Sequence, residues 1–259
     1  MKMQIIIRLS LIAFCVSMMI ASAKAGMKEG ISWYDNRHQD SKGFIASKIN
    51  IDKAINEFKT ALSSPLENKE AALYLLKSYY YKAEFTTSKI EEKKLIFNEG
   101  KALGKEYINK YPNSIEYKYW YLVNLGSWAK VYGIITAARE GVADQMKTFS
   151  EDIIKLNPIY KDGAGYFMLG AVHYKSPYIP FLLSWPDNNE AIKYLQLAHD
   201  TGKATLNQKN YLAQAIHKDG QIVKAKKLLN DVINSSPDPN NLVEELDDIN
   251  EAKNILKTF

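Results

Sequence analysis

Cysteine is almost absent from this chain of 259 residues. The single cysteine, Cys15, lies within the first 25 residues. A protein that has lost this N-terminal segment would have no thiol, no disulfide and no cysteine ligand for a metal ion. Its stability would then depend on its hydrophobic core alone, and a chain of this length can bury enough apolar surface to build one.

Histidine is scarce as well, and its four positions do not suggest catalysis. His38, His173, His199 and His217 do not lie at metal-ligand spacing from one another. The sequence has neither a glycine-rich phosphate-binding loop nor the nucleophile elbow of a hydrolase. Because His173 occupies a helix-packing position, a role in the core is favoured for it. We therefore expect a protein that is not an enzyme and binds no cofactor and no metal.

No charge of one sign dominates the chain. The formal net charge is +5, from 34 basic and 29 acidic residues. Loss of residues 1–25 removes Lys2, Arg8 and Lys24 but no acid, which lowers the net charge to +2. The remaining basic residues are interspersed with acids, as on a solvated helical surface. The composition therefore gives no support for a nucleic-acid partner, and we expect none.

The first 25 residues have the features of a secretory signal peptide. Lys2 and Arg8 form a basic start, residues 9–20 are mostly apolar, and Ala23 and Ala25 are the small residues that a signal peptidase requires. An uncleaved anchor is the alternative, because the apolar stretch is just long enough to span a bilayer. We expect cleavage, which leaves one domain over residues 26–259 in the periplasm.

Lipid attachment is not expected. A lipoprotein signal requires a small residue immediately before the modified cysteine. Phe14 precedes Cys15 in this chain. The exported protein is therefore expected to carry no lipid anchor.

Glycine and proline are sparse, with 13 and 8 residues, and most of them stand at the ends of segments. Between them, apolar residues recur with the 3.6-residue period of an α-helix. No convincing stretch after residue 44 alternates with the two-residue period of a strand. The chain is therefore expected to be all-α.

A repeat of 34 residues occurs in the C-terminal half. Ala191 and Leu195 recur 34 positions later as Ala225 and Leu229. Small residues let two antiparallel helices approach to about 8–10 Å, and the leucines fill the spaces between them. A period of 34 is typical of the tetratricopeptide (TPR) helical hairpin. We expect a TPR-like solenoid of about five hairpins, with residues 240–259 as a C-terminal capping helix.

Two helix boundaries can also be predicted. Ser88 and Glu91 have the spacing of a capping box, in which each side chain bonds the other residue's backbone N–H. A single helix is expected over residues 133–156, with a kink at Gly141 and an end before Pro158.

The stretch over residues 115–132 is the most aromatic in the chain. It places aromatic and amide side chains at helical spacing: Tyr117, Trp120, Asn124, Trp128 and Tyr132. Large aromatic residues often hold the core of a solenoid together. The inner surface of a solenoid is also its usual binding face. Both interpretations stay open, so these five residues are candidates for binding a ligand or partner.

Residues 176–187 form an insertion that a TPR hairpin does not need. It carries Tyr178, Phe181 and Trp185 among three prolines. Such an apolar segment would be unfavourable in water and prone to association, so it should cover something. It could fill the groove of its own solenoid, or it could form the lip of a site for a ligand or partner.

Further motifs follow one another along the chain. They are Trp33-Tyr34 with Arg37; Tyr119-Trp120 with Asn124, Gly126 and Trp128; and Asn157-Pro158 with Gly163, Gly165-Tyr166, Leu169-Gly170, Tyr174 and the prolines of residues 177–186. In these motifs the chain resembles the TRAP transporter T-component (TatT-like) family of periplasmic TPR proteins. The resemblance implies an all-helical solenoid that can form a homo-oligomer. It also implies association with a periplasmic solute-binding protein and a role for an apolar solute.

The sequence thus favours an exported scaffold that binds a partner protein, and an apolar small molecule, along an aromatic inner face. The alternative is a structural adaptor of a cell-envelope complex without a small-molecule site. The positions of Trp120, Trp128 and Trp185 distinguish the two. Tryptophans around an open cavity would favour ligand binding, and tryptophans packed against neighbouring helices would favour the adaptor.

Overall fold

The computed structural model describes residues 26–181 and 183–259. Residues 1–25, the predicted signal peptide, lie outside this part, so both the assignment and the cleavage stay predictions. All the regular elements of the described residues are helices, and two isolated β-bridges are the only strand-like pairings there. None of these helices combines the length and the apolar character needed to cross a bilayer. The predicted all-α class is confirmed.

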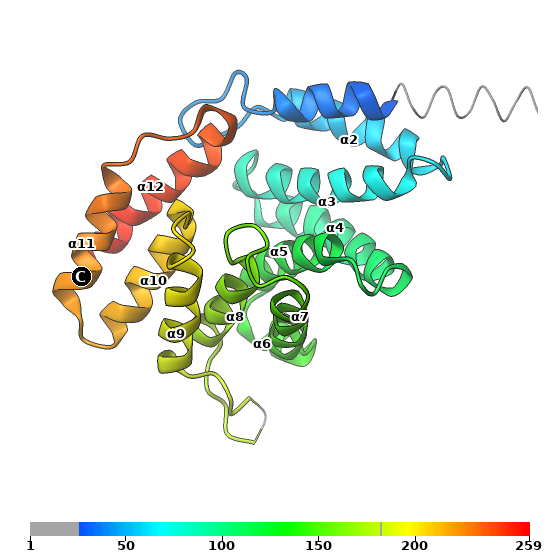
Figure 1. Ribbon diagram of the computed structural model, residues 1–259. Coiled ribbons are helices and arrows are strands. Elements are labelled where there is room, and N and C mark those ends of the chain that lie inside the picture. Colours follow the sequence, from blue (N-terminus) through cyan, green and yellow to red (C-terminus); the bar gives the residue numbers. More distant parts are fainter. Residues whose placement is uncertain (1–25, 182) are drawn as a thin grey trace, which may run out of the picture.

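The helices form five antiparallel hairpins followed by a final helix (Figure 1). They are a helix over residues 26–35, α2 (Lys48–Leu62), α3 (Asn68–Phe85), α4 (Ile90–Lys110), α5 (Ile115–Tyr132), α6 (Ile134–Arg139), α7 (Val142–Leu156), α8 (Ala164–Lys175), α9 (Asn188–His199), α10 (Leu206–Lys218), α11 (Ile222–Ile233), the short 3₁₀ helix η1 (Pro239–Asn241) and α12 (Leu242–Leu256). The hairpin count and the C-terminal helix agree with the sequence prediction.

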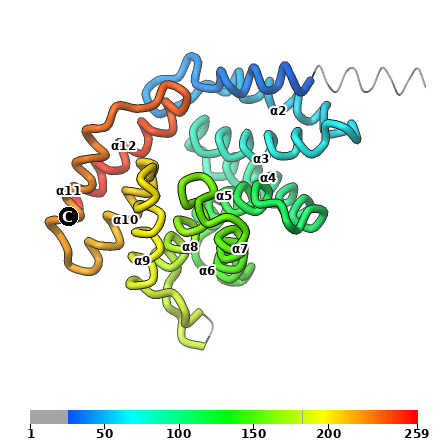
Figure 2. The backbone as a smooth tube through the Cα atoms, in the orientation of Figure 1, coloured from blue at the N-terminus to red at the C-terminus, as the bar shows by residue number. Residues whose placement is uncertain are grey.

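The hairpins stack into two layers. Helices α3, α5, α8, α10 and α12 contact one another in turn and form the inner layer. Helices α2, α4, α7, α9 and α11 pack behind them. Figure 2 shows that the array curves, so that α12 returns to the N-terminal segment. The inner helices therefore face the inside of the curve.

Close approach between α8 and α9 depends on Gly170. A Cβ atom at this position would lie 2.7 Å from Cγ of Leu195 and 2.9 Å from its backbone nitrogen. Ala191, Leu195 and their repeats Ala225 and Leu229 are all buried. The small and large residues of the 34-residue repeat therefore pack as the sequence predicts.

The single kinked helix predicted over residues 133–156 was wrong. The chain forms α6, breaks at Gly141 and starts again as α7. Gly141 has φ of 60°, a left-handed conformation that glycine adopts without steric cost. This residue separates two helices and does not bend one.

The capping box predicted at residues 88–91 was also wrong. Helix α4 has no side-chain cap. The helix begins one residue later than predicted, with Lys89 and not Ser88 at the N-cap position, and the Thr87 hydroxyl donates to the Glu92 carboxylate at 2.7 Å. The structure forms a capping box at α10, where Thr205 and Gln208 bond each other's backbone N–H groups.

Arg37 closes the curve of the solenoid. Its guanidinium donates to Glu244 at 2.8 Å and to the backbone oxygen of Asn240 at 2.9 Å. The same group lies 4.7 Å from the ring centroid of Tyr34 and 5.2 Å from that of Tyr81. Arg37 is 7% exposed, so its charge depends on these partners for solvation. This contact joins the first hairpin to α12.

Candidate functional site

Three of the five candidates on α5 lie in the core. Tyr117, Asn124 and Trp128 are buried. The Asn124 amide donates to the backbone oxygens of Leu76 (3.0 Å) and Trp120 (2.9 Å), which ties α5 to α3. Buried amides need such partners, so Asn124 is held by the fold.

Trp128 and Tyr132 lie at the seam between α5 and α4. Their rings stack with centroids 4.3 Å apart. The indole N–H of Trp128 donates to the Asn98 side-chain oxygen at 2.8 Å, and the Asn98 amide donates to the Tyr132 hydroxyl at 2.8 Å. The Lys101 ammonium lies 3.7 Å from the Trp128 ring centroid. This cluster holds one hairpin together and does not face the inside of the curve.

The insertion packs at the corner between α6 and α7. The Trp185 indole N–H donates to Asp144 at 2.9 Å, and its ring meets the His173 ring edge-on at 4.9 Å. Tyr178 and Phe181 are exposed at the tip, which projects from the molecule (Figure 1). Of the two alternatives left open for this segment, the structure does not support filling of the solenoid groove, because the anchoring contacts of the segment lie on α7 and at the end of α8.

His173 has a structural partner. Its Nδ1 accepts the backbone N–H of Asp187 at 3.2 Å, at the start of α9. Burial lowers the pKa of His173, so the neutral ring that this hydrogen bond requires is favoured. These contacts agree with the predicted core role.

The inner layer carries a row of aromatic side chains that connect one inner helix to the next. Tyr80 of α3 lies 6.2 Å from Trp120 of α5, and Phe167 of α8 lies 5.3 Å from Tyr211 of α10, measured between ring centroids. All members are half-buried. This inner aromatic belt consists of Tyr80, Tyr119, Trp120, Tyr160, Phe167, Tyr174 and Tyr211. Among the candidates predicted from the sequence, only Trp120 belongs to it.

The phenols of the belt are neutral at physiological pH. Burial raises the pKa of Tyr119 and Tyr211 to about 12, and it also raises the pKa of Tyr80 well above its usual value. A neutral tyrosine offers an apolar ring and a hydroxyl that can donate or accept a hydrogen bond. Such side chains suit contact with another polypeptide.

Charged groups border the belt. Burial opposes ionisation of Glu84 on α3, but Lys130 at 2.8 Å and Lys93 at 3.7 Å hold its pKa below the usual value. The electrostatic influence of Glu84 and Lys130 extends to Tyr211 on α10 and Asp247 on α12. Charged groups on α3 and α5 therefore affect the pKa values of groups on α10 and α12, near the other end of the inner layer.

The pKa of Asp248 on α12 provides a test of how strongly this region disfavours an ionised carboxyl group. Burial, opposed by a hydrogen bond from Asn207 and reinforced by Glu251, raises its pKa to about 7. The folded protein thus holds a proton here between about pH 4 and pH 7 that the unfolded chain releases, so stability falls as pH rises through this range.

We expect Asp248→Asn to be more stable than the unsubstituted protein at pH 8 by on the order of 1–2 kcal/mol. The advantage should shrink as pH falls toward 4. Urea unfolding followed by circular dichroism between pH 4 and pH 8 measures it. A stability difference between the two proteins that does not change with pH would contradict the raised pKa of Asp248.

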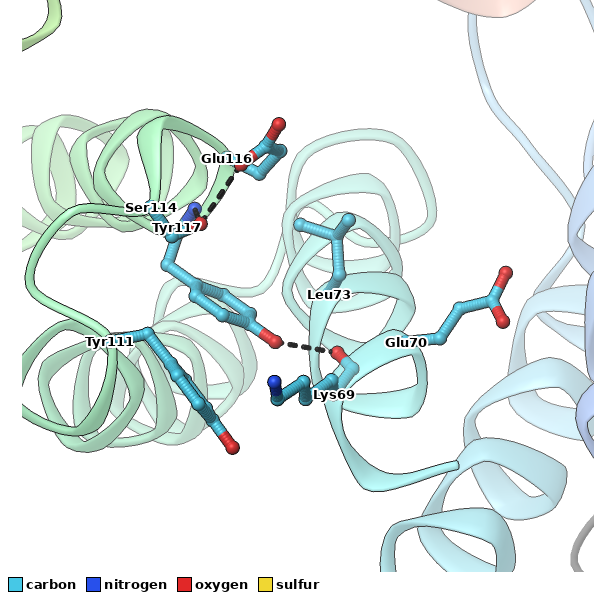
Figure 3. A pocket seen from close by; sticks show the side chains of 7 residues that line it. All are labelled: Lys69, Glu70, Leu73, Tyr111, Ser114, Glu116 and Tyr117. Atoms are coloured by element: carbon cyan, nitrogen blue, oxygen red, sulfur yellow. Dashed lines mark hydrogen bonds between the residues drawn. The ribbon is translucent and has the colours of Figure 1, made fainter. Parts of the chain in front are cut away.

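A pocket of about 460 Å³ lies where α3 begins and α4 turns into α5 (Figure 3). The Tyr117 hydroxyl donates to the backbone oxygen of Lys69 at 2.8 Å, and the Lys69 ammonium lies 4.6 Å from the ring centroid of Tyr111. We call this feature the rim pocket; its lining is Lys69, Glu70, Leu73, Tyr111, Ser114, Glu116 and Tyr117. Tyr117 is the only predicted site residue in it, and no tryptophan lines it.

No group of three or more histidine, cysteine, aspartate or glutamate residues is placed to hold a metal ion within residues 26–181 and 183–259. The charged groups of the inner layer are instead distributed among ion pairs and the acids of α12.

The model of one protein family, described as regulator of microtubule dynamics protein 1-3 (RMD1-3), matches residues 40–182. This match covers more than half of the chain. The chain belongs to the RMD1-3 family. The matched region extends from just before α2 into the insertion, so it includes the inner helices α3, α5 and α8.

The chain also resembles a solved structure, that of TTC0263, a thermophilic TPR protein of Thermus thermophilus. The TM-score is 0.57 at 16% sequence identity, over 88% of this chain and 98% of that chain. At this identity the likeness shows the fold alone, which is TPR-like. No curated protein matches the sequence.

Proposed function

We propose that this RMD1-3 family member is a non-enzymatic scaffold that holds a segment of a partner protein against its inner face. The observation that carries this proposal is the inner aromatic belt. Its half-buried rings are fixed on successive helical hairpins and bordered by paired charges. Solenoids of this class bind through their extended concave surfaces.

The arrangement of the tryptophans favours a protein partner over a small molecule. Trp128 is packed in the core and Trp185 is anchored on Asp144. Trp120 packs beside Tyr80 on the belt. By the criterion set from the sequence, packed tryptophans favour the adaptor. The rim pocket, at the start of α3 and of α5, offers a place for one side chain of the bound segment.

The finer part of the proposal concerns the identity of the partner. Export by the N-terminal segment would place the scaffold in the periplasm, where the TatT-like resemblance makes a solute-binding protein of a TRAP-type transporter the proposed partner. A structural partner in a cell-envelope complex is the alternative. The RMD1-3 description names regulation of microtubules, which are protein polymers, and so also favours a protein partner.

Capture of the partner tests the proposal. Trp120→Ala and Tyr211→Ala remove half-buried rings of the belt from two inner helices, and interface aromatics commonly contribute about 2 kcal/mol or more to binding. Each variant is immobilised as the full chain and exposed to native envelope extract. We expect it to capture roughly a thirtieth or less of the partner that the unsubstituted chain captures.

Leu197→Ser is the matched control. Leu197 is 41% exposed on α9, in the outer layer, so its replacement should leave capture unchanged. Urea midpoints for all variants separate a binding defect from unfolding. Equal capture by the folded inner-face variants and the control would overturn the proposal.

A further inference from the structure

Three acids of α12 face the inside of the curve. Asp247, Asp248 and Glu251 are all half-buried. Residues three and four positions apart share one face of a helix, so Glu251 lies beside both aspartates. The electrostatic influence of Asp248 reaches Tyr80 on α3 and Tyr211 on α10, both members of the inner aromatic belt. We call Asp247, Asp248 and Glu251 the α12 acids.

The α12 acids form no ion pair with any of the described residues, because the nearby cations have other partners. Arg37 is paired with Glu244, while Lys130 and Lys93 both lie at Glu84. The charged groups that interact with the α12 acids, these three included, are five acids and three lysines: Asp247, Asp248, Glu251, Glu245 and Glu84, with Lys93, Lys130 and Lys175. When all of these groups are ionised, the region carries an excess of two negative charges.

The polar atoms around Asp248 also lack a donor. Its Oδ1 accepts the Asn207 amide at 2.9 Å, and its Oδ2 has no partner among the described residues. Asn210 is 0% exposed and donates to the backbone oxygen of Asp248 at 2.8 Å, yet no described residue donates to its own Oδ1. Buried acceptors normally receive a hydrogen bond. The side chain that best supplies such bonds has several N–H donors and no acceptor, as arginine and lysine do.

We infer that the partner segment places a basic side chain among the α12 acids. The inference rests on the proposed function, because it specifies the chemistry of the segment that the inner face holds. The cation would pair with carboxylates that have no counter-ion and would lie near the rings of Tyr80 and Tyr211, whose faces attract cations. Arginine fits better than lysine, since a planar guanidinium binds a carboxylate through two N–H groups and stacks on aromatic rings.

The ionisation of Asp248 agrees with a missing counter-ion. Burial raises its pKa to about 7, the hydrogen bond from Asn207 opposes the rise, and the neighbouring acids Glu251 and Asp247 add to it. A bound cation would favour the ionised carboxylate and lower this pKa. Protons and the basic side chain therefore compete for Asp248, so binding should weaken as pH falls from about 8 to about 5.5.

A phage-displayed library of random dodecapeptides tests the inference on the immobilised full chain at about pH 8. Selected peptides are screened against Trp120→Ala, which identifies those that the inner aromatic belt holds. We expect these belt-dependent peptides to be enriched in arginine or lysine beside aromatic residues. Belt-dependent peptides without a basic residue would overturn the inference and leave the proposed function intact. If the unsubstituted chain selects no belt-dependent peptide, the proposed function itself is contradicted.

One selected peptide that lacks histidine then measures the contribution of charge by fluorescence anisotropy. Citrulline in place of its arginine, or acetyl-lysine in place of its lysine, removes the charge and should weaken binding about tenfold. Asp248→Asn should weaken binding of the original peptide by a similar factor, and the two losses should not add. Because Asp248→Asn is expected to be more stable than the unsubstituted protein, unfolding cannot account for its lower affinity.

Asp231→Asn is the matched control. Asp231 is exposed on α11, in the outer layer, so the same change of side chain should leave the affinity unaltered. As pH falls to about 5.5, the affinity of the unsubstituted chain should approach that of Asp248→Asn. Equal affinities of these two chains at about pH 8 would overturn the inference, as would equal binding of the charged and uncharged peptides.

Discussion

Gly170→Ala is expected to destabilise the protein by about 3 kcal/mol, the upper part of the range for overpacked cores. The added Cβ would meet Cγ of Leu195 at 2.7 Å, its backbone nitrogen at 2.9 Å and the backbone oxygen of Ala191 at 3.1 Å. A side chain can move away, but the α9 backbone can do so only if the two helices separate. The expected result is a lower urea midpoint and a melting temperature reduced by roughly 6–12 °C.

Gly126→Ala is the matched control. This glycine also lies inside a helix, α5, but an added Cβ would meet only Cε of Met146, at 3.8 Å. Alanine loses less conformational freedom than glycine on folding, so this variant should be more stable by roughly 0.5–1 kcal/mol. A decrease in stability of similar size in both variants would show that helix propensity, and not the α8–α9 contact, governs the response.

Arg37→Met is expected to cost about 2–3 kcal/mol and to open the curve of the solenoid. Methionine keeps much of the volume but leaves Glu244, whose side chain is 23% exposed, without its cation. Removing one partner of a buried pair is strongly unfavourable because the other charge stays desolvated. The Asn240 oxygen also loses its donor. Urea unfolding measures the stability, and small-angle X-ray scattering should show a larger radius of gyration.

The exposed pair of Lys59 and Glu99 provides the comparison. Both side chains are about half exposed, at 49% and 52%, so Lys59→Met should change stability by less than about 1 kcal/mol. It should leave the radius of gyration unchanged. If Arg37→Met behaves like Lys59→Met, the contact between the first hairpin and α12 does not maintain the closed shape.

Much of the fold could be predicted from the sequence, because the packing of a helical hairpin depends on the spacing of small and large apolar residues within it. Ala191 and Leu195, with their counterparts 34 residues later, are all buried between paired helices. The break at Gly141 could not be distinguished from a kink, because a glycine in a helical pattern is compatible with either. Only its left-handed backbone, with φ of 60°, decides between them.

The candidate site was predicted less well for a geometric reason. Tyr117, Asn124 and Trp128 share one face of α5, and that face packs into the array. Trp120 lies at the edge of that face, about 60° around the helix from Tyr117, and reaches Tyr80. An inner helix of a solenoid has aromatic residues on both sides, so helical spacing alone does not show which side is open.

The other residues of the inner aromatic belt could not be predicted from a local sequence pattern. Tyr80, Phe167 and Tyr211 come from different hairpins and meet only through the curvature of the array. No motif in their own helices marks them as members of one surface.

Site-specific photocrosslinking tests the central claim, that the inner face holds a partner protein, most directly. Benzoylphenylalanine at position 211 places the crosslinker on the inner aromatic belt of α10, and the same residue at position 223 places it on exposed α11. In cells that contain the native partner, we expect a discrete protein adduct from position 211 and none from position 223. An adduct from position 223, with none from position 211, would contradict the claim.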